Sequence, residues 1–171
     1  MSSPHYRASR VEHAHERDIA AIASLNNLFA PDGLTLHRSE DFVTSHLQDY
    51  QVLRDDDGAV LGCVALDEYS PSLVELVSLA VSPDAQGRGI GRQLIAAAEQ
   101  LAGERGYPEL FAISLAEQLF LSAGFCASSI VDYPEKIARY QKISRSELSI
   151  GRKFCFTRTL AARGTAAARA A

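Results

Sequence analysis

The chain contains the run Val81-Ser82-Pro83-Asp84-Ala85-Gln86-Gly87-Arg88-Gly89-Ile90-Gly91-Arg92-Gln93-Leu94, in which three glycines stand at alternate positions. Residues 73–81 are apolar except for Glu75 and Ser78 and predict a buried strand. Apolar residues then recur at helical spacing and predict a helix over residues 89–103. Glycine lets the loop turn its N–H groups toward one point, and the helix start adds unpaired N–H groups and a positive dipole end. The run therefore predicts an anion site suited to a pyrophosphate.

Two better-known phosphate loops do not fit this run. A P-loop needs Gly-Lys-Ser/Thr, whereas Arg92-Gln93 follows Gly91 here. A Gly-x-Gly-x-x-Gly dinucleotide fingerprint needs a sixth-position glycine, and that position holds Arg92 or Leu94. What remains is Val-x-Pro followed by Gln-x-x-Gly-x-Gly. A glycine-rich turn without a ligand is the alternative interpretation, and the strand and helix around the loop argue against it.

Hydrophobic patterns along the chain predict an α/β domain. Strands are predicted over residues 6–11, 50–54, 59–67, 73–81, 110–114, 127–131 and 154–160, and helices over residues 15–29, 39–47, 89–103, 116–123 and 134–141. This order favours three layers with a largely antiparallel first half and one right-handed strand–helix–strand unit. Residues 55–58, Asp-Asp-Asp-Gly, predict a hairpin turn, which we favour over a metal site because further calcium ligands are missing.

Composition limits the class of protein. A length of 171 residues and 47% hydrophobic content predict one globular domain over residues 1–160, followed by a disordered Ala-rich tail over residues 161–171. The net charge of −4 argues against a nucleic-acid partner. The chain has no apolar run long enough to span a membrane, and its first residues lack the apolar core of a signal peptide.

The three cysteines, Cys63, Cys126 and Cys155, are widely spaced and form no Cys-x-x-Cys pair. Neither a zinc site nor a disulfide framework is expected from this spacing. Each cysteine lies in an apolar, strand-like context, so we predict that all three are small buried hydrophobic residues. The expected compartment is the reducing cytoplasm.

The glycine-rich pattern resembles the acetyl-CoA loop of the GNAT acetyltransferases, and the resemblance extends over residues 6–160. It implies a three-layer fold with helices on both faces of a mixed, mostly antiparallel sheet, which splays between its fourth and fifth strands. It also implies acetyl-CoA as co-substrate, with its pantetheine arm in the gap, and no metal. The residues it implies for cofactor binding are Leu79, Ala80, Val81, Gln86, Gly87, Arg88, Gly89, Ile90, Gly91, Arg92 and Phe120.

Glu75 is the candidate general base. A lone carboxylate in an apolar strand has a raised pKa if it is buried, but the alternation of a strand also allows it to face solvent. The resemblance favours the base, because many of these enzymes carry a Glu six residues before the Val-x-Pro valine, acting directly or through water. The same strand would offer an oxyanion donor near residues 79–81. Ser78 either hydrogen-bonds the substrate or caps a bulge.

Phe120 occupies the position where family members often place a tyrosine that protonates the CoA thiolate. Phenylalanine cannot donate a proton, so the thiolate leaves unprotonated or takes a proton from water. Tyr133 and Tyr140 are alternative donors, although packing roles are favoured for both.

Five further segments resemble the acetyltransferase domain of N-acetylglutamate synthases, including short forms, in which a phenylalanine at this position is usual. They are residues 34–39, 62–66, 75–81, 120–125 and 133–137. The resemblance implies glutamate as acceptor, and two carboxylates call for arginines. Arg38 would hold the α-carboxylate and Arg152 the side-chain carboxylate, with Leu36 and Ser78 beside the substrate; surface positions are the alternative for both arginines. The cysteine- and proline-containing segment that often follows Pro-Glu-Lys is absent, which leaves the acceptor open.

Two competing hypotheses remain. A different small-molecule or protein amine, such as a polyamine, a drug amine or a protein N-terminus, would need an acidic mouth, for which Asp67, Glu68 and Glu75 are available. A non-catalytic module that senses acetyl-CoA for a partner would not need Glu75. A homodimer is expected by analogy with the fold.

Overall fold

The computed structural model describes residues 10–143 and 153–161. The elements are β1 (Val11–His13), α1 (Ile19–Leu28), α2 (Glu40–Ser45), β2 (Tyr50–Arg54), β3 (Val60–Ser70), β4 (Leu73–Val81), α3 (Ile90–Glu104), β5 (Glu109–Ser114), α4 (Glu117–Ser122), β6 (Cys126–Ser128), α5 (Pro134–Gln141) and β7 (Phe154–Thr159). Arg152, residues 6–9 of the predicted first strand and residues 162–171 of the Ala-rich tail lie outside the described residues.

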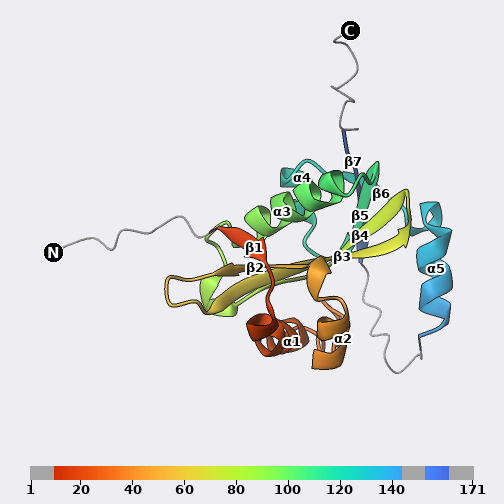
Figure 1. Cartoon of the computed structure of the whole chain (residues 1–171). Helices are drawn as coiled ribbons and strands as arrows, with labels where there is room; N and C mark the ends of the chain where they lie inside the picture. Colours follow the sequence, from red (N-terminus) through yellow and green to blue (C-terminus); the bar gives the residue numbers. More distant parts are fainter. Residues whose placement is uncertain (1–9, 144–152, 162–171) are drawn as a thin grey trace, which may run out of the picture.

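Seven strands form one sheet in the order β1-β2-β3-β4-β5-β7-β6. Neighbouring strands pair antiparallel, except that β4 and β5 run parallel. Helices α1 and α2 cover one face and α3 and α4 the other, so the molecule has three layers (Figure 1). This arrangement confirms the predicted α/β class and the mixed, mostly antiparallel sheet.

The two faces of the sheet bury separate hydrophobic cores. Leu94, Ile95 and Ala98 of α3 are fully buried against one face, and Ile22 and Val43 of α1 and α2 against the other. The helical spacing of the α3 residues places them on one stripe, as the sequence pattern predicts. The sheet thereby forms a rigid base between the helices, and β4 crosses its centre.

A bulge interrupts β4 near its end. Cys63 pairs with Ala80 and Ala65 pairs with Val77, so Ser78 and Leu79 together oppose the single residue Val64 of β3. Ser78 has a φ of 54°, the one positive φ among the described residues that are not glycine. A bulge leaves part of the strand unpaired and redirects the side chains that follow. Accordingly, Val77 packs with the α1–α2 core, whereas Leu79 packs with the α3 core.

The splay between β4 and β5 begins just before this bulge. The two strands pair only through Val74–Leu76 and Leu110–Ala112. β4 then continues to Val81 and β5 to Ser114 without pairing with each other. The sheet is therefore open at this point, which is the gap that the resemblance implies.

Three predictions about the strands and cysteines need correction. The strand predicted over residues 6–11 is shifted, because among the described residues Arg10 lies outside β1, which runs from Val11 to His13 and pairs with β2. Cys63 and Cys155 are buried, but Cys126 is exposed, because it begins the edge strand β6. The strand predicted over residues 127–131 ends at Ser128, because the Ser129 N–H donates to Asp132 Oδ2 and the Val131 N–H donates to Ser129 Oγ. Short polar side chains that bond the local backbone compete with strand pairing.

The acidic run at residues 55–58 forms the predicted turn. Gly58 has a φ of 87°, and Asp55 Oδ1 accepts hydrogen bonds from the N–H groups of Asp57 and Ala59. Asp55 therefore stabilises the connection between β2 and β3. Within the described ranges, no three His, Cys, Asp or Glu side chains are arranged to hold a metal ion.

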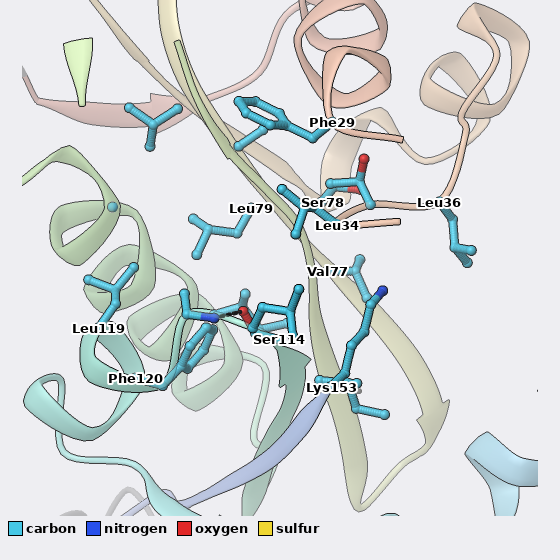
Figure 2. A pocket seen from close by; sticks show the side chains of 18 of the residues that line it. Phe29, Leu34, Leu36, Val77, Ser78, Leu79, Ser114, Leu119, Phe120 and Lys153 are labelled. Atoms are coloured by element: carbon cyan, nitrogen blue, oxygen red, sulfur yellow. Dashed lines mark hydrogen bonds between the residues drawn. The ribbon is translucent and has the colours of Figure 1, made fainter. Parts of the chain in front are cut away.

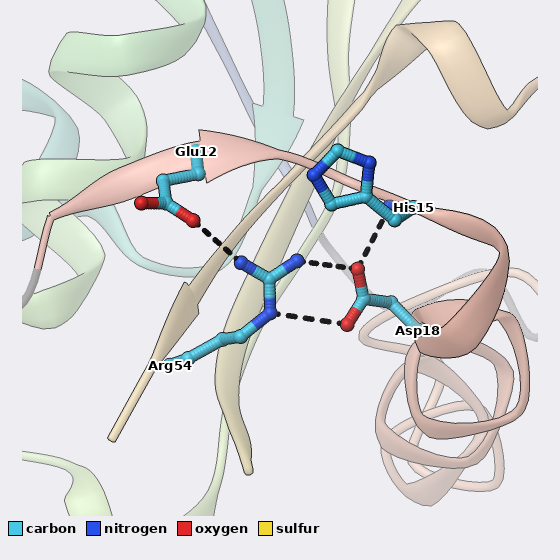
Figure 3. A network of polar contacts seen from close by, with 4 residues as sticks. All are labelled: Glu12, His15, Asp18 and Arg54. Atoms are coloured by element: carbon cyan, nitrogen blue, oxygen red, sulfur yellow. Dashed lines mark hydrogen bonds and ion pairs between the residues drawn. The ribbon is translucent and has the colours of Figure 1, made fainter. Parts of the chain in front are cut away.

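A network of ion pairs, buried at Asp18, largely buried at Arg54 and exposed at Glu12, ties the first strand and helix to β2 (Figure 3). Arg54 donates to both carboxylate oxygens of Asp18, at 3.1 and 2.5 Å, and to Glu12 at 2.8 Å. Asp18 also accepts the N–H of His15 at 2.7 Å.

Of the helices in the described part of the chain, none combines the length and the apolar character that crossing a membrane requires.

Candidate active site

A cavity of about 490 Å³ opens where β4 and β5 separate (Figure 2). One wall is formed by β4 and the glycine-rich loop, and another by the end of β5 and by α4. Residues of the segment before α2, of α5 and of the start of β7 complete the lining. The splay thus joins the predicted anion loop and the predicted base in one cavity.

The glycine-rich loop adopts left-handed backbone conformations that favour glycine. Gly87 and Gly89 have φ values of 78° and 79°, and Gly89 is the N-cap of α3. A Cβ at either position would meet no atom within 4 Å, so the backbone rather than space requires glycine. Gln86 Nε2 donates to the Val81 carbonyl at 3.1 Å and a guanidinium nitrogen of Arg88 donates to the Asp84 carbonyl at 2.9 Å. These bonds fix the loop at the positive end of a 15-residue helix.

The residues predicted for cofactor binding lie around this cavity with one exception. Arg88 does not line it, because its guanidinium turns back to the loop carbonyl of Asp84. Arg92 lies on the wall and donates to the Ser122 carbonyl at 3.3 Å. Phe120 is almost fully buried and stacks on Phe156 with ring centroids 5.2 Å apart, so it forms an apolar wall. The lining residues of the predicted set are Leu79, Ala80, Val81, Gln86, Gly87, Gly89, Ile90, Gly91, Arg92 and Phe120.

Glu75 is buried and faces the cavity rather than bulk solvent. Its Oε2 atom accepts hydrogen bonds from Tyr69 Oη and from Lys136 Nζ, each at 2.8 Å. The side chains of Glu75 and Lys136 are 4% and 7% exposed, so this is a buried ion pair. No hydrogen bond from a described residue reaches Oε1. One oxygen therefore anchors the carboxylate, and the other remains available to a ligand.

Lys136 was not a candidate from the sequence, because it lies 61 residues after Glu75 on a different element. Its ammonium is 4.5 Å from the centroid of the Tyr140 ring and 5.9 Å from that of Tyr69. Burial and the neighbouring Glu75 carboxylate raise the pKa of Tyr69, and they raise the pKa of Tyr140 to about 12. Both hydroxyls stay protonated at neutral pH.

The two tyrosines considered as proton donors are separated by the fold. Tyr140 lines the cavity, whereas Tyr133 does not line it, stacks on Phe111 and donates to Glu109 at 2.7 Å. Ser114, at the end of β5, lies beside Phe120 at the cavity wall (Figure 2). Its Oγ accepts the N–H of Ala116 at 3.0 Å, which leaves the hydroxyl proton free to point elsewhere. A hydroxyl therefore lies near the position where the tyrosine is missing.

Arg38 and Leu36 line the cavity on a segment that α1 holds in place. Asn26 donates to the Leu36 carbonyl at 2.8 Å, and Asn27 bonds both the N–H and the carbonyl of Arg38, at 2.8 and 2.7 Å. The guanidinium of Arg38 stacks 4.2 Å from the centroid of the Phe42 ring. Among the described residues, no carboxylate pairs with the Arg38 guanidinium, so its N–H donors are available to an anion.

Ser78 lies at the bulge and lines the cavity, and its Oγ is 3.3 Å from Tyr50 Oη. Ser78 therefore lies at a bulge, which is one of the two alternatives from the sequence. Its place in the cavity wall also allows it to contact a ligand.

Lys153 is a second lining residue that sequence reasoning missed. It immediately follows Arg152, and it lies in the cavity with its side chain directed toward the side where Val77 lies (Figure 2). Burial and then the nearby Lys136 lower the pKa of the Lys153 amine, while Glu75 opposes the shift. Its position beside the predicted Arg152, at the start of the last strand, was the only signal in the sequence.

Comparison with known proteins identifies the family. The model of the acetyltransferase (GNAT) family matches residues 15–125, which include β4, the glycine-rich loop and α3. The chain belongs to the GNAT acetyltransferase family.

Three relatives show where this GNAT protein stands. It is 34% identical over 129 residues to an uncharacterised N-acetyltransferase of Chlorobaculum tepidum, covering 75% of this chain and 83% of the relative. It is 35% identical over 127 residues to an amino-acid acetyltransferase of Neisseria meningitidis, covering 73% of this chain and 29% of that protein. The solved N-acetylglutamate synthase of Neisseria gonorrhoeae, complexed with coenzyme A and N-acetyl-glutamate, superimposes with a TM-score of 0.75 at 30% identity, over 88% of this chain and 35% of that one.

This GNAT protein is therefore an acetyl-CoA-dependent N-acetyltransferase similar to the amino-acid acetyltransferases. It spans about a third of the length of the amino-acid acetyltransferase and of the N-acetylglutamate synthase named above. Its own geometry fits the co-substrate, because the N–H-rich loop at the start of α3 suits a pyrophosphate and the splay leaves the β5-facing edge of β4 without a strand partner beside an apolar wall.

Proposed function

We propose that the chain transfers the acetyl group of acetyl-CoA to the α-amine of glutamate or a closely related acidic amino acid. The charge of the cavity wall supports an anionic acceptor. Among the described residues, its lining contains one carboxylate, Glu75, against four cations, Arg38, Arg92, Lys136 and Lys153. The single carboxylate already pairs with Lys136. A cavity with this excess of positive charge favours carboxylates over a polyamine.

Glu75 would act as general base: it would accept a proton from the acceptor amine, which attacks the thioester of acetyl-CoA directly. Its anchored position and its free oxygen support this role, because a base must be held within reach of the proton it accepts, directly or through one water. N–H groups of β4 beyond the bulge at Ser78 would polarise the thioester carbonyl. The Ser114 hydroxyl is available to give a proton to the leaving thiolate.

Arg38 and Lys153 would hold the two carboxylates of the acceptor. Arg38 offers a planar fork of donors, which suits a carboxylate. Lys153 lies next to Arg152 and supplies the second cation from the described part of the wall. Leu36 and Ser78 would contact the part of the acceptor that lies between its two carboxylates.

The competing hypotheses have less support. Of the acidic residues that could recruit a cationic acceptor, Asp67 pairs with Arg139 at 2.5 Å, and Glu68 accepts from Tyr107 and does not line the cavity. A sensing module would have no need of the buried pair between Glu75 and Lys136 at a cavity wall. Both hypotheses remain outcomes of the same experiment.

A thiol-release assay with acetyl-CoA and a panel of amines tests the proposal. The panel holds glutamate, glutamine, aspartate, lysine, spermidine and an aminoglycoside. We expect turnover with glutamate above the others. Turnover with the cationic amines alone would contradict the acceptor, and acetyl-CoA binding without any turnover would favour the sensor.

Glu75→Gln tests the base within that assay. We expect the transfer rate to fall about 10²–10⁴-fold, with acetyl-CoA affinity retained. This substitution also leaves the buried ammonium of Lys136 without its partner, which is destabilising. The double variant Glu75→Gln/Lys136→Met removes both charges and is the control: it should recover thermal stability but not turnover.

A further inference from the structure

Lys153 brings a primary amine into the cavity that has to hold a reactive thioester. Only three of the 17 basic residues of the chain are lysines, namely Lys136, Lys142 and Lys153, and the first and last of these line the cavity. The arginines cannot act as nucleophiles, because a guanidinium stays protonated in proteins. The cavity therefore offers two amines of the protein itself to an acetyl donor.

The two amines differ in their surroundings. Lys136 is buried and bonded to Glu75 at 2.8 Å, which occupies its ammonium. No other described residue makes a hydrogen bond or an ion pair with the Lys153 amine. Burial and the charge of Lys136 lower the pKa of Lys153, so more of it is in the neutral, nucleophilic form than in an exposed lysine.

The register of β7 places Lys153 at the mouth of the splay. Phe154, the next residue, pairs with Ser114 at the end of β5. Lys153 therefore extends one residue beyond the last pair, where β4 and β5 have already separated. Its side chain is directed toward the part of β4 near Val77, just before the bulge that would hold the thioester carbonyl (Figure 2).

We propose that Lys153 is a self-acetylation site, modified when acetyl-CoA is bound and no acceptor is present. The neutral amine attacks the thioester carbonyl, a C–N bond forms and the C–S bond breaks. CoA leaves as the thiolate, and the proton that the amine loses balances the thiolate. The products are Nε-acetyl-lysine at position 153 and free CoA.

Self-acetylation would turn the enzyme off when its acceptor is scarce. This consequence rests on the proposed function, in which Lys153 binds a carboxylate of the acceptor. An acceptor carboxylate would stabilise the ammonium form and protect the residue, whereas an acetylated lysine carries no charge and cannot hold the acceptor.

Intact-mass measurement and peptide mapping of the full chain, incubated with acetyl-CoA alone, test the site. We expect a gain of one acetyl group at Lys153 and none at Lys142, which is exposed and serves as the internal control. Lys153→Arg should remain unmodified, and Lys142→Arg should gain the acetyl group at the wild-type rate. Excess free CoA should suppress the reaction by competing for the cavity.

Three outcomes would overturn the site: an unchanged mass, equal modification of Lys142 and Lys153, or modification that free CoA does not suppress. A parallel arm with glutamate separates this inference from the proposed function. If glutamate is not acetylated and does not slow acetylation at Lys153, glutamate is not the acceptor, but the proposal that Lys153 acetylates itself still holds. Turnover of glutamate by a chain that never acetylates itself would contradict the site alone.

Discussion

Arg38 combines a stacked guanidinium with a backbone clamped by Asn27, which holds it ready for a carboxylate at low entropic cost. We predict that Arg38→Ala raises the KM for glutamate and lowers kcat/KM about 10- to 100-fold, because a charge-assisted hydrogen-bond pair is lost. The kcat/KM of Arg38→Lys should lie between those of the wild type and Arg38→Ala, because lysine keeps the charge but lacks the planar fork of donors. Steady-state kinetics with varied glutamate measure both effects.

Arg105→Ala is the matched control for Arg38, because Arg105 pairs with Asp49 on the surface and does not line the cavity. It should leave kinetic constants for glutamate unchanged. A KM for acetyl-CoA that rises in Arg38→Ala as much as the KM for glutamate would contradict the assignment of Arg38 to the acceptor.

The cavity residues that could be foreseen are those embedded in local patterns. Glu75 interrupts an apolar strand, and the loop glycines stand at fixed offsets from one another, so both are visible in the sequence. Lys136 and Lys153 became visible only when distant segments met at the splay. Their positions in the cavity depend on tertiary packing, which residue type and spacing do not reveal, although Lys153 adjoins the predicted Arg152.

Among the elements, α3 depends on the backbone conformation of its N-cap residue, Gly89. We predict that Gly89→Ala lowers stability by about 1–2 kcal/mol, because an L-residue is strained at its φ of 79°, and weakens acetyl-CoA binding. Gly103→Ala, inside the same helix with nothing within 4 Å of the added Cβ, should instead stabilise by about 0.5–1 kcal/mol. Thermal denaturation and acetyl-CoA titration of both variants test the pair; equal effects would contradict the conformational explanation.

The bounds of β4 were predictable, whereas the bulge in it was one of two alternatives that the sequence left open for Ser78. The sequence predicts β4 over the residues that the structure shows, because apolar character fixes where a buried strand begins and ends. A bulge depends on which partner residue each strand residue meets, and Ser78 lies in an otherwise continuous strand pattern. Strand register is a long-range property, so the exchange of faces between Val77 and Leu79 appeared only in the folded sheet.

At the scale of the whole molecule, the network around Asp18 joins β1, α1 and β2 (Figure 3). Burial alone would raise the pKa of Asp18, but its bonds with Arg54 and with the His15 N–H outweigh this and lower it below 3.8. The stabilisation is therefore complete above that value and is lost as the pH falls through the lower pKa of the folded state. We predict that Asp18→Asn costs about 1–3 kcal/mol at neutral pH and reduces the acid sensitivity of unfolding.

Urea unfolding at neutral pH and below pH 3.8 checks this prediction. Glu16→Gln, which changes an exposed acid two residues away, is the control and should leave the pH dependence as it is. An acid sensitivity of Asp18→Asn equal to that of the wild type would show that other carboxylates govern it.

Because β4 and β5 separate, part of the stability of the sheet can come from a bound ligand instead of from strand pairing. Beyond Leu76, β4 and β5 each keep their other neighbour, but the edges that face each other have no strand partner, so a ligand bound in the cavity can supply contacts there. A ligand that binds only the folded state raises its population by mass action. We therefore expect bound acetyl-CoA to raise the stability of the folded state and to slow proteolysis of this protein.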